Sequence, residues 1–484
     1  MSDEHLDVLI VGAGISGIGA GYHLQAKCPR HSYAILEGRD AIGGTWDLFR
    51  YPGIRSDSDM YTLGYAFRPW TGEKAIADGP SILNYLRETA RAYGIERKIR
   101  FGYQVKRAAW SSQTASWTVE AERAGSGAIL RLRCNFLFMC SGYYDYAEGY
   151  TPQFEGIERF AGRIVHPQKW SADIDYAGKR VVVIGSGATA VTLVPELAKQ
   201  AAQVTMLQRS PTYVVARPSV DAAAAKLRRW LPARLAHGLT RWKNVLFGMY
   251  FFNLCRRKPG RARELLLGGV RMALGPDYDI ATHFTPRYKP WEQRLCLVPD
   301  GDLFRAICEQ RVAVVTDHID RFTETGMKLR SGRELPADLV VTATGLKLQV
   351  LSDVELTLDG ERVDPGRRFT YKGMMFSDVP NFASSFGYTN ASWTLKSDLT
   401  CAYVCRLLRH MQKTGARICV PRLRHADMAA EAWVDFSSGY FQRALDKLPK
   451  QGTQKPWKLH QNYLRDLVAL KFAPLQDEAM EFSR

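Results

Sequence analysis

Two glycine-rich turns in the sequence have the spacing that binds the pyrophosphate of a dinucleotide. The first, GAGISG at residues 12–17, follows the apolar run 8–11, and the second, GSGATA at residues 185–190, follows the apolar run 181–184. The glycines of such a turn permit a tight bend and let the backbone approach the phosphates, which then lie at the N-terminus of the next helix. One such turn is a weak signal, but each copy here stands between a strand-like run and a helical pattern. We therefore expect two dinucleotide sites.

The two units end in side chains of opposite charge. Glu37 closes the first unit after the strand-like run 33–36, and Arg209 closes the second after the run 204–207. A carboxylate at this place accepts hydrogen bonds from the hydroxyls of an adenosine ribose and repels a 2′-phosphate, whereas an arginine pairs with that phosphate. Glu37 therefore indicates FAD or NAD, and Arg209 indicates NADPH. Both sites in one chain imply a flavoenzyme that takes electrons from NADPH.

The elements around these turns predict an α/β fold with two dinucleotide-binding, Rossmann-like units of three layers each. The strand-like run 136–139 ends the first unit, and the run 339–342 ends the second in the same way. We expect an FAD-binding domain at residues 1–148 and 347–484, and an NADPH-binding domain at residues 151–346 with a helical insertion at about 217–280. In the last segment, Ser397-Asp398 is expected to open a helix that runs through Leu407 and Met411.

Composition narrows the class of protein. The chain has 484 residues and a net charge of +17, with its lysines and arginines spread along the sequence. Because no arginine-rich tail or nucleic-acid motif accompanies that charge, we expect attraction of anionic NADPH and no nucleic-acid partner. The nine cysteines form no CxxC pair and no metal-ligand spacing, so we expect reduced thiols in a cytoplasmic protein and no metal site. The acidic N-terminal segment, residues 1–5, does not resemble a signal peptide.

One stretch, residues 245–255, is strongly apolar and precedes the basic run Arg256-Arg257-Lys258. It is too short to span a bilayer. Two interpretations remain open: a buried helix in the inserted helical region, and a helix that lies at a membrane surface. Short apolar runs usually mark cores, so we expect the buried helix and treat peripheral membrane contact as the less favoured alternative.

Two further segments carry longer signatures. Residues 43–57 join the paired glycines of GGTW to Asp57, and residues 160–170 have the form F-x-G-x-x-x-H-x-x-x-W, with Phe160, Gly162, His166 and Trp170. On these segments, and on GYTNASWTLK at residues 387–396, the chain resembles the type I Baeyer–Villiger monooxygenases and, within them, the ethionamide-activating group. The resemblance extends over nearly the whole chain.

The resemblance implies roles for individual residues. Arg294 and Asp57 match the active-site arginine and aspartate of the family, and the signature that contains His166 is implied to couple domain movement to catalysis. The expected FAD-binding residues are Gly12, Gly14, Ser16, Gly17, Glu37, Gly44, Thr45, Trp46, Asp57 and Val105. The expected NADPH-binding residues are Gly185, Ser186, Gly187, Ala188, Thr189, Arg209 and Ser210. The candidate pocket residues are Tyr388, Asn390 and Trp393, and the insertion 217–280 and the loop 353–367 are expected to shape that pocket.

The activity that the resemblance implies is the oxidation of a ketone to an ester or lactone with NADPH and dioxygen, through a C4a-peroxyflavin. The substrate is then a small-molecule ketone or, in a sulfoxidation side activity, a thioether. Arg294 suits an anionic oxygen adduct because a guanidinium stays cationic and donates in a fixed fork. Asp57 would hold that guanidinium in place through a carboxylate–guanidinium pair.

Other functions share some of these features. A flavin-containing monooxygenase that oxygenates nitrogen or sulfur uses the same cofactors, but Trp170 and Arg294 favour ketone oxidation. An NADPH-dependent disulfide reductase needs a close cysteine pair such as CxxC, which the sequence lacks, and an NADPH-dependent flavin reductase or oxidase is less favoured. The intact glycines disfavour a basic membrane- or nucleic-acid-binding protein on a decayed flavoprotein scaffold.

Overall fold

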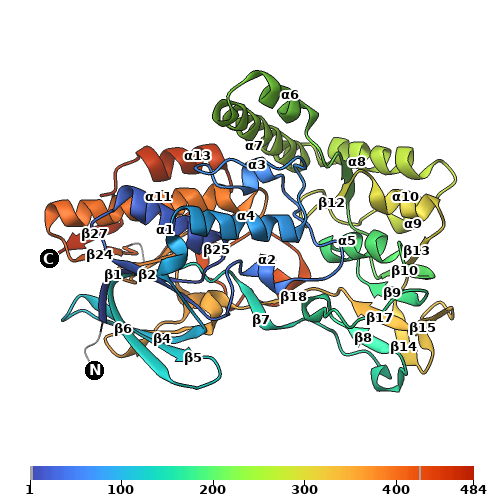
Figure 1. The fold of residues 1–484 in the computed structure, drawn as a ribbon, viewed down its shortest axis with the longest axis horizontal. Helices are drawn as coiled ribbons and strands as arrows, with labels where there is room; N and C mark the ends of the chain where they lie inside the picture. Colours follow the sequence, from blue (N-terminus) through green and yellow to red (C-terminus); the bar gives the residue numbers. More distant parts are fainter. Residues whose placement is uncertain (1–3, 425–426) are drawn as a thin grey trace.

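The larger of the two main sheets combines strands from residues 4–139 with strands from residues 355–384 (Figure 1). The computed structural model describes residues 4–424 and 427–484, so residues 1–3 of the acidic N-terminal segment lie outside the described part. The strands of this sheet are β1 (Glu4–Val11), β2 (Tyr33–Glu37), β3 (Ile99–Phe101), β4 (Tyr103–Ser111), β5 (Ser116–Arg123), β6 (Ile129–Met139), β19 (Glu355–Leu358), β20 (Glu361–Arg362) and β23 (Phe382–Ser384). Their order is β20-β19-β4-β5-β6-β1-β2-β3, with β23 paired to β6. The strands β6, β1, β2 and β3 run parallel, as a dinucleotide-binding unit requires.

Three helices cover one face of this sheet: α1 (Ile15–Lys27), α4 (Gly79–Ala92) and α11 (Trp393–Thr414). Successive strand residues point to opposite faces, so Val8 and Ile10 pack beneath the helices. Leu9 packs on the other face, against a cluster that includes Trp117. The helix α11 lies against α1, and this contact brings the C-terminal segment back to the first glycine turn.

The smaller sheet is entirely parallel and carries the second glycine turn. It has the order β13-β10-β9-β17-β8. Its strands are β8 (Arg163–Val165), β9 (Arg180–Ile184), β10 (Gln203–Gln208), β13 (Val312–Thr316) and β17 (Leu339–Thr342). Helices α5 (Ala188–Leu197) and α10 (Asp302–Cys308) cover one face, and an antiparallel sheet of β14 (Ile319–Thr323), β15 (Gly326–Leu329) and β16 (Glu334–Pro336) covers the other. The predicted α/β class with Rossmann-like units is confirmed.

The chain crosses between the two sheets twice, side by side. The strand β7 (Tyr144–Gly149) leaves the larger sheet, and β18 (Leu346–Leu348) returns to it antiparallel to β7. In Figure 1 this two-stranded ribbon lies between the two sheets. The orientation of one unit relative to the other therefore depends on a short antiparallel pair.

An insertion of helices leaves the smaller unit between two paired strands, β11 (Val214–Arg217) and β12 (Cys296–Pro299). It contains α6 (Ala222–Trp230), α7 (Ala233–Arg257), α8 (Pro259–Leu274) and α9 (Ile280–His283). The expectation that the apolar stretch 245–255 is buried is wrong in part. Val245 and Cys255 are buried, but Leu246, Phe247 and Tyr250 are at least half exposed. The inner face of α7 is occupied by small and polar residues, and the larger apolar side chains therefore point outward.

The start of α11 also differs from the sequence-based expectation. The helix begins at Trp393, not at Ser397-Asp398, and Ser392 precedes it without a side-chain cap. Trp393 is held by a hydrogen bond from its Nε1 to Ser16 Oγ (2.7 Å) and by stacking on Tyr143. These tertiary contacts extend the helix by one turn beyond the local capping signal, because packing outweighs local propensity in most protein helices.

Shorter elements complete the structure. They are α2 (Thr45–Leu48), α3 (Met60–Leu63), β21 (Thr370–Tyr371), β22 (Met375–Phe376), β24 (Ile418–Pro421), β25 (Ala430–Ala432), α12 (Gly439–Gln442), β26 (Lys450–Gly452), α13 (Tyr463–Leu467) and β27 (Met480–Ser483). Single helical turns lie at η1 (Ile95–Lys98), η2 (Ile157–Arg159), η3 (Pro167–Lys169), η4 (Val350–Asp353), η5 (Pro365–Arg367) and η6 (Val468–Phe472). Within residues 4–424 and 427–484, every helix is too short or too polar to cross a bilayer.

Candidate functional site

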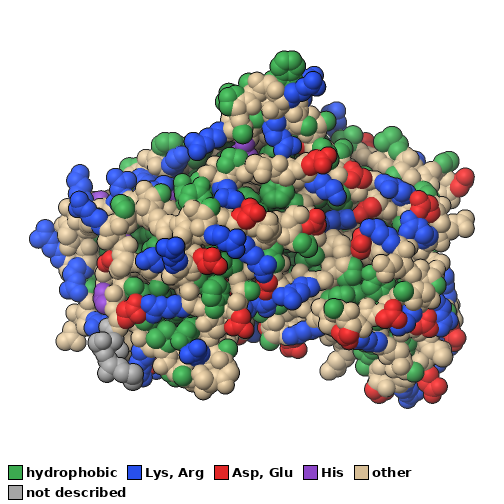
Figure 2. All heavy atoms as spheres, viewed as in Figure 1, with side chains coloured by type: hydrophobic (Ala, Val, Ile, Leu, Met, Phe, Trp, Pro, Cys, Tyr) green, Lys and Arg blue, Asp and Glu red, His purple; other side chains and the backbone are tan. Residues whose placement is uncertain are grey.

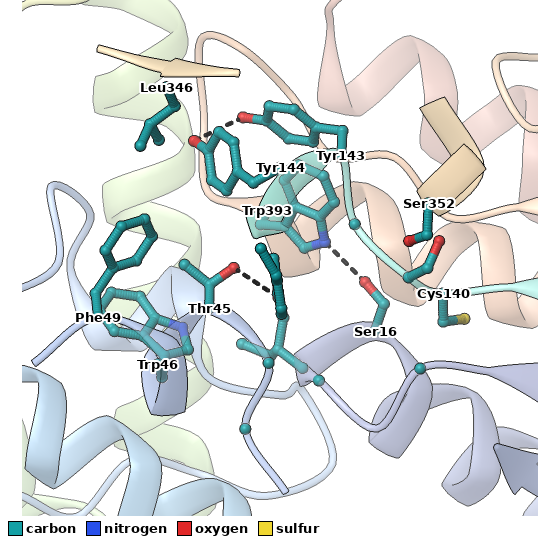
Figure 3. Close-up of a pocket in the computed structure, with 18 of the residues that line it drawn as sticks. Ser16, Thr45, Trp46, Phe49, Cys140, Tyr143, Tyr144, Leu346, Ser352 and Trp393 are labelled. Carbon is teal, nitrogen blue, oxygen red and sulfur yellow. Dashed lines mark hydrogen bonds between the residues drawn. The ribbon is translucent and has the colours of Figure 1, made fainter. Parts of the chain in front are cut away.

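A cavity of about 580 Å³ extends from the first glycine turn to residues of the smaller unit. This volume lies within the roughly 300–1,000 Å³ usual for small-molecule sites. Figure 3 shows part of its lining, including Ser16, Thr45 and Trp46. The larger unit contributes the turn itself, residues 43–46 and the segment 54–58 to the lining. The smaller unit contributes Ala188, Thr189, Thr192 and Arg294. Both glycine-turn regions therefore reach the same cavity.

The floor of the cavity at the first turn excludes side chains. At Gly12 the backbone has φ +103°, and a Cβ there would lie 2.7 Å from the carbonyl oxygen of Cys140. A Cβ on Gly44 would lie 3.2 Å from the Cα of Gly14. Gly14 precedes α1 without a side-chain cap, so the first amides of the helix remain available to an anion. This cradle fits the pyrophosphate of a dinucleotide such as FAD.

Glu37 lies at the end of β2 and lines the same cavity. Its carboxylate accepts hydrogen bonds from the amides of Ala13 (2.7 Å) and Arg39 (2.9 Å). Burial raises the pKa of Glu37, although the two amides favour its ionised form. A buried carboxylate beside the glycine turn has acceptor oxygens for ribose hydroxyls, as FAD requires. Val105 lines the cavity on the same side.

Arg294 and Asp57 form an ion pair in the cavity wall. Arg294 Nη1 lies 3.5 Å from Asp57 Oδ2, and both residues line the cavity. Arg294 lies two residues before β12, which is anchored where the amide of Cys296 donates to the carbonyl of Tyr213 (2.9 Å). Asp57 lies in a loop held where the amide of Ser56 donates to the carbonyl of Ala77 (3.0 Å). The pair therefore joins a loop of the larger unit to the insertion of the smaller one.

The surroundings of Arg294 preserve its charge. Burial alone would lower the pKa of the guanidinium, but the neighbouring Tyr440, Asp57, Tyr143 and Tyr144 outweigh that effect, and the pKa of Arg294 is raised. The side chain is 37% exposed and lines the cavity. It is therefore a permanent cation that a bound molecule can reach.

Aromatic side chains form much of the remaining wall (Figure 3). The hydroxyls of Tyr143 and Tyr144 lie 3.1 Å apart, and Trp393 stacks on Tyr143 with ring centroids 5.4 Å apart. Burial raises the pKa of Tyr143, so its phenol stays protonated. Neither tyrosine was predicted from the sequence. They lie in the segment that leads from the end of β6 at Met139 into β7, and the rule that ligands bind beyond the carboxyl ends of parallel strands could have identified them.

The other expected residues of the first site and of the pocket are mostly in the lining. Gly14, Ser16, Thr45, Trp46, Tyr388 and Trp393 line the cavity, and Gly17 packs beside Gly12 with no room for a side chain. Asn390 does not line it, because its side-chain amide turns away and donates to the carbonyl of Gln461 (2.8 Å). The insertion 217–280 contributes no lining residue, and of the loop 353–367 only Val354 does. Most of that loop instead adds β19 and β20 to the larger sheet.

The second glycine turn is only partly in the cavity. Ala188 and Thr189, at the start of α5, line it, whereas Gly185, Ser186, Gly187, Arg209 and Ser210 lie outside the lining. Ser186 Oγ donates to the carbonyl of Ser210 (2.9 Å), so the turn and the end of β10 lie together. Arg209 and Ser210 are exposed. The carboxyl edge of the smaller sheet therefore presents a cation beside an uncapped helix start.

The signature residues 160–170 lie against the ribbon that joins the two units. His166 Nε2 lies 3.0 Å from the carbonyl oxygen of Gly345, and His166 Nδ1 accepts a hydrogen bond from the amide of Gln168 (3.2 Å). A Cβ on Gly149 would fall only 1.9 Å from the imidazole. Phe160 is buried, Trp170 is half-buried, and Gly162 approaches the carbonyl of Asp338. His166 thus touches both crossing segments and stays outside the cavity.

Similar proteins of known name match the chain along its whole length. It is 55% identical over 482 residues to the FAD-containing monooxygenase EthA of Mycobacterium tuberculosis, and the match covers 99% of this chain and 98% of that protein. It is 46% identical over 484 residues to the probable FAD-binding monooxygenase AlmA of Acinetobacter baylyi, with 100% and 97% covered. Family models described as an NAD(P)-binding Rossmann-like domain and as flavin-binding monooxygenase-like match residues 10–74 and 76–227.

A solved structure shares the fold at lower identity. An oxidized steroid monooxygenase bound to NADP superposes with a TM-score of 0.77 at 23% identity, over 99% of this chain and 100% of that one. A relative that is 55% identical over almost the full chain establishes the family and confirms the resemblance found in the sequence. The chain belongs to the FAD-containing monooxygenases of the EthA type.

Proposed function

We propose that this protein is an NADPH- and dioxygen-dependent Baeyer–Villiger monooxygenase that converts ketones into esters or lactones, with oxidation of thioethers as a side activity. The observation that supports this proposal most directly is the Arg294–Asp57 pair in the wall of the cavity that also contains the first glycine turn. Steroid and cyclohexanone monooxygenases are among the proteins of similar fold.

Each cofactor has a proposed unit. Residues 1–148 and 347–484 would bind FAD, because the Gly12 turn, Glu37, Thr45, Trp46 and Val105 all belong to these segments. Residues 151–346 would bind NADPH, through the uncapped start of α5 and through Arg209, whose guanidinium can pair with a 2′-phosphate. When bound, the flavin supplies the redox chemistry with NADPH and dioxygen, and the chain supplies binding, orientation and electrostatics.

Arg294 provides the electrostatic part of this scheme. Its guanidinium keeps a full positive charge and presents fixed donors toward the cavity. A preoriented cation stabilises negative charge on oxygen as it develops, and this effect is larger in a cavity poor in water. Asp57 orients the guanidinium, and the stacked Tyr143 and Trp393 close the wall beside it and restrict water.

A reducing compartment suits these requirements. All nine cysteines are free thiols, eight of them buried. NADPH and free thiols both belong to reducing surroundings, so we place the reaction in the cytoplasm.

The test is product formation by Arg294→Ala. Because the FAD cradle lies in other segments, we expect this variant to keep its flavin and to oxidise NADPH, with leakage to hydrogen peroxide. Ester formation should fall by about 10²–10³, the loss typical when one preoriented donor is removed. Three assays check this prediction with linear, cyclic and aryl ketones. They measure the rate of NADPH consumption, the release of hydrogen peroxide, and the amount of ester found by chromatography. Arg159→Ala, at an arginine that is 71% exposed and pairs with its neighbour Glu158, is the matched control.

Ester formation by Arg294→Ala within twofold of the wild-type rate would contradict the assigned role. A wild-type enzyme that oxidises thioethers or amines but none of the ketones would instead identify the heteroatom-oxygenating alternative.

A further inference from the structure

The exposed face of α7 carries a row of large apolar side chains. Figure 1 shows α6 and α7 at the top of the molecule, above the rest of the chain. The row consists of Leu235, Leu239, Trp242, Leu246 and Tyr250, which are between 41% and 64% exposed. Spacings of three and four residues place these side chains on one face of a helix. In a helix packed on a protein core, this is the face expected to be buried.

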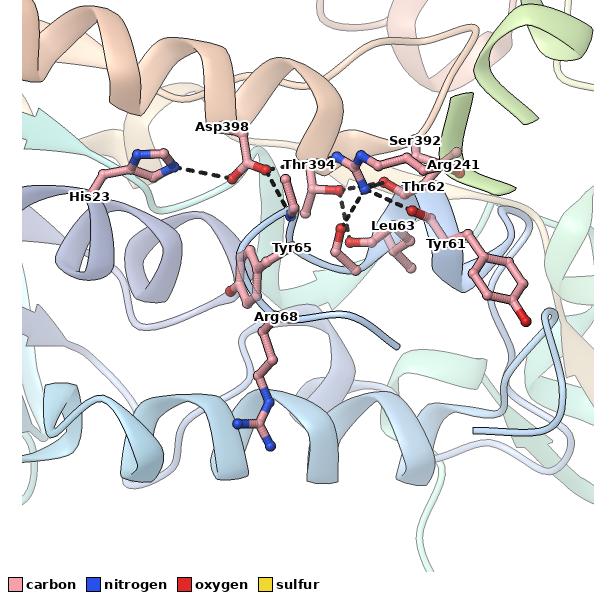
Figure 4. A network of polar contacts seen from close by, with 12 residues as sticks. His23, Tyr61, Thr62, Leu63, Tyr65, Arg68, Arg241, Ser392, Thr394 and Asp398 are labelled. Carbon is pink, nitrogen blue, oxygen red and sulfur yellow. Dashed lines mark hydrogen bonds and ion pairs between the residues drawn. The ribbon is translucent and has the colours of Figure 1, made fainter. Parts of the chain in front are cut away.

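The contacts of the inner face of α7 explain why its apolar face is exposed instead of buried (Figure 4). The buried Arg241 donates through Nη1 to the carbonyls of Tyr61 (2.8 Å) and Gly64 (2.8 Å), at the C-terminal end of α3. Asn244 donates to the carboxylate of Asp59 (2.9 Å). These bonds satisfy carbonyls that a helix end leaves without partners. The polar side of α7 is therefore hydrogen-bonded to the larger unit, and the apolar side faces outward.

The charge around this row is predominantly positive, although Asp221 pairs with Lys243 and Asp435 pairs with Arg256. Residues 222–263, which include α6 and α7, contain eleven lysines and arginines and neither aspartate nor glutamate. Figure 2 shows blue and green side chains on the projecting part of the molecule. An apolar row flanked by cations is the composition of helices that lie in the interface of an anionic membrane.

We propose that α6 and α7 form a docking surface for an anionic phospholipid bilayer, with α7 lying parallel to the membrane plane. The row would enter the region between headgroups and acyl chains, and the flanking cations would contact lipid phosphates. A second copy of this chain is a poorer occupant, because it would bring together two surfaces on which lysines and arginines outnumber acidic residues. The surface reaches further at the end of α6, where Trp230 is 76% exposed.

The position of α7 links this surface to the cavity. Val245 and Met249 on its other side pack with Tyr388 and Ala391, which line the cavity. The bilayer-facing row and the cavity wall therefore lie on opposite sides of one helix, about 10–12 Å across. A docked enzyme would hold its cavity close to apolar molecules dissolved in the membrane.

The test is co-sedimentation of the purified holoenzyme with vesicles. One set of vesicles contains phosphatidylcholine alone, and the other contains phosphatidylcholine mixed with phosphatidylglycerol. We expect binding to the mixed vesicles at low salt, less binding at high salt, and little binding to phosphatidylcholine. The double variants Leu239→Glu/Leu246→Glu and Leu239→Gln/Leu246→Gln should each bind at least tenfold more weakly; the glutamine pair removes apolar surface without adding charge. Ile129→Glu, at an apolar residue of β6 that is 57% exposed, is the matched control and should bind as the wild type does.

Flavin content and thermal unfolding midpoint of each variant report whether it folds, and both should equal those of the wild type because the substituted residues are exposed. The proposal is overturned if the wild type does not bind mixed vesicles at low salt, or if both double variants bind them as the wild type does. It is also overturned if analytical ultracentrifugation finds a dimer that the same substitutions dissociate while vesicles are not bound. That result would identify a second copy as the occupant.

Discussion

At the scale of single residues, the cofactor cradle depends on positions where a side chain cannot fit. Gly12 combines φ +103° with a Cβ position 2.7 Å from the carbonyl oxygen of Cys140. Gly12→Ala should therefore lose most of its flavin, because the Cβ displaces the backbone that approaches the pyrophosphate. Gly125→Ala is the control, because Gly125 has φ +78° but no atom lies within 4 Å of its Cβ position. This variant has only the backbone cost of about 1–2 kcal/mol, and it should keep its flavin. Flavin absorbance per protein measures the result, and a fully loaded Gly12→Ala would refute this account of the cradle.

The same scale shows what the sequence could predict about the site. A strand, a glycine turn and a helix are consecutive in sequence, so their pattern predicted two dinucleotide turns with Glu37 and Arg209 at the ends of the two units. Asp57 and Arg294 lie in distant segments, and their 3.5 Å pair exists only because the fold joins two units. No local pattern connects them, and only the family resemblance named both. Tyr143 was missed because its role depends on the edge at which β6 ends.

At the scale of elements, α7 is held by a polar inner face that includes the buried His237. Neither ring nitrogen has a hydrogen-bond partner among the described residues, and burial, with a smaller contribution from the charge of Arg241, lowers the pKa of His237 to about 4. Between pH 6.5 and about 4 the unfolded chain binds a proton here that the folded chain does not, so the free energy of unfolding decreases as pH falls. The loss is on the order of 3 kcal/mol. His237→Leu should lose less stability than the wild type between pH 7.5 and pH 5 in urea unfolding; parallel losses would contradict this reading.

Two helices show why element boundaries and exposure were harder to predict than element type. For α11, Ser397-Asp398 imitated a helix start, but the hydrogen bond from Trp393 to Ser16 moved the start four residues earlier. For α7, apolar composition favoured burial. Arg241 instead turned the polar face inward, because three backbone carbonyls around α3 needed a donor. In both cases a contact distant in sequence decided the outcome.

At the scale of the whole molecule, residues of both units line the cavity, so its shape depends on how the two units are oriented relative to each other. Besides the β7–β18 ribbon, Arg55 of the larger unit pairs with Asp302 on α10 of the smaller unit, and Arg294 pairs with Asp57. A change in the ribbon would shift Arg294 relative to the proposed FAD-binding residues, although the ribbon contains none of these residues. We therefore propose that the ribbon couples motion of the units to chemistry in the cavity.

Gly149→Ala tests this coupling. The added Cβ would fall 1.9 Å from the imidazole of His166 and push it away from the carbonyl of Gly345, to which its Nε2 donates. Burial lowers the pKa of His166, so the ring is neutral at pH 7 and its displacement removes a hydrogen bond but no charge. We expect wild-type flavin content and NADPH oxidation, but several-fold less ester per NADPH consumed. Gly260→Ala, in α8 with open space around its Cβ, should keep the wild-type ratio. An unchanged ratio in Gly149→Ala would place the coupling elsewhere, whereas loss of flavin together with the ratio would show that the ribbon supports the fold of the larger unit.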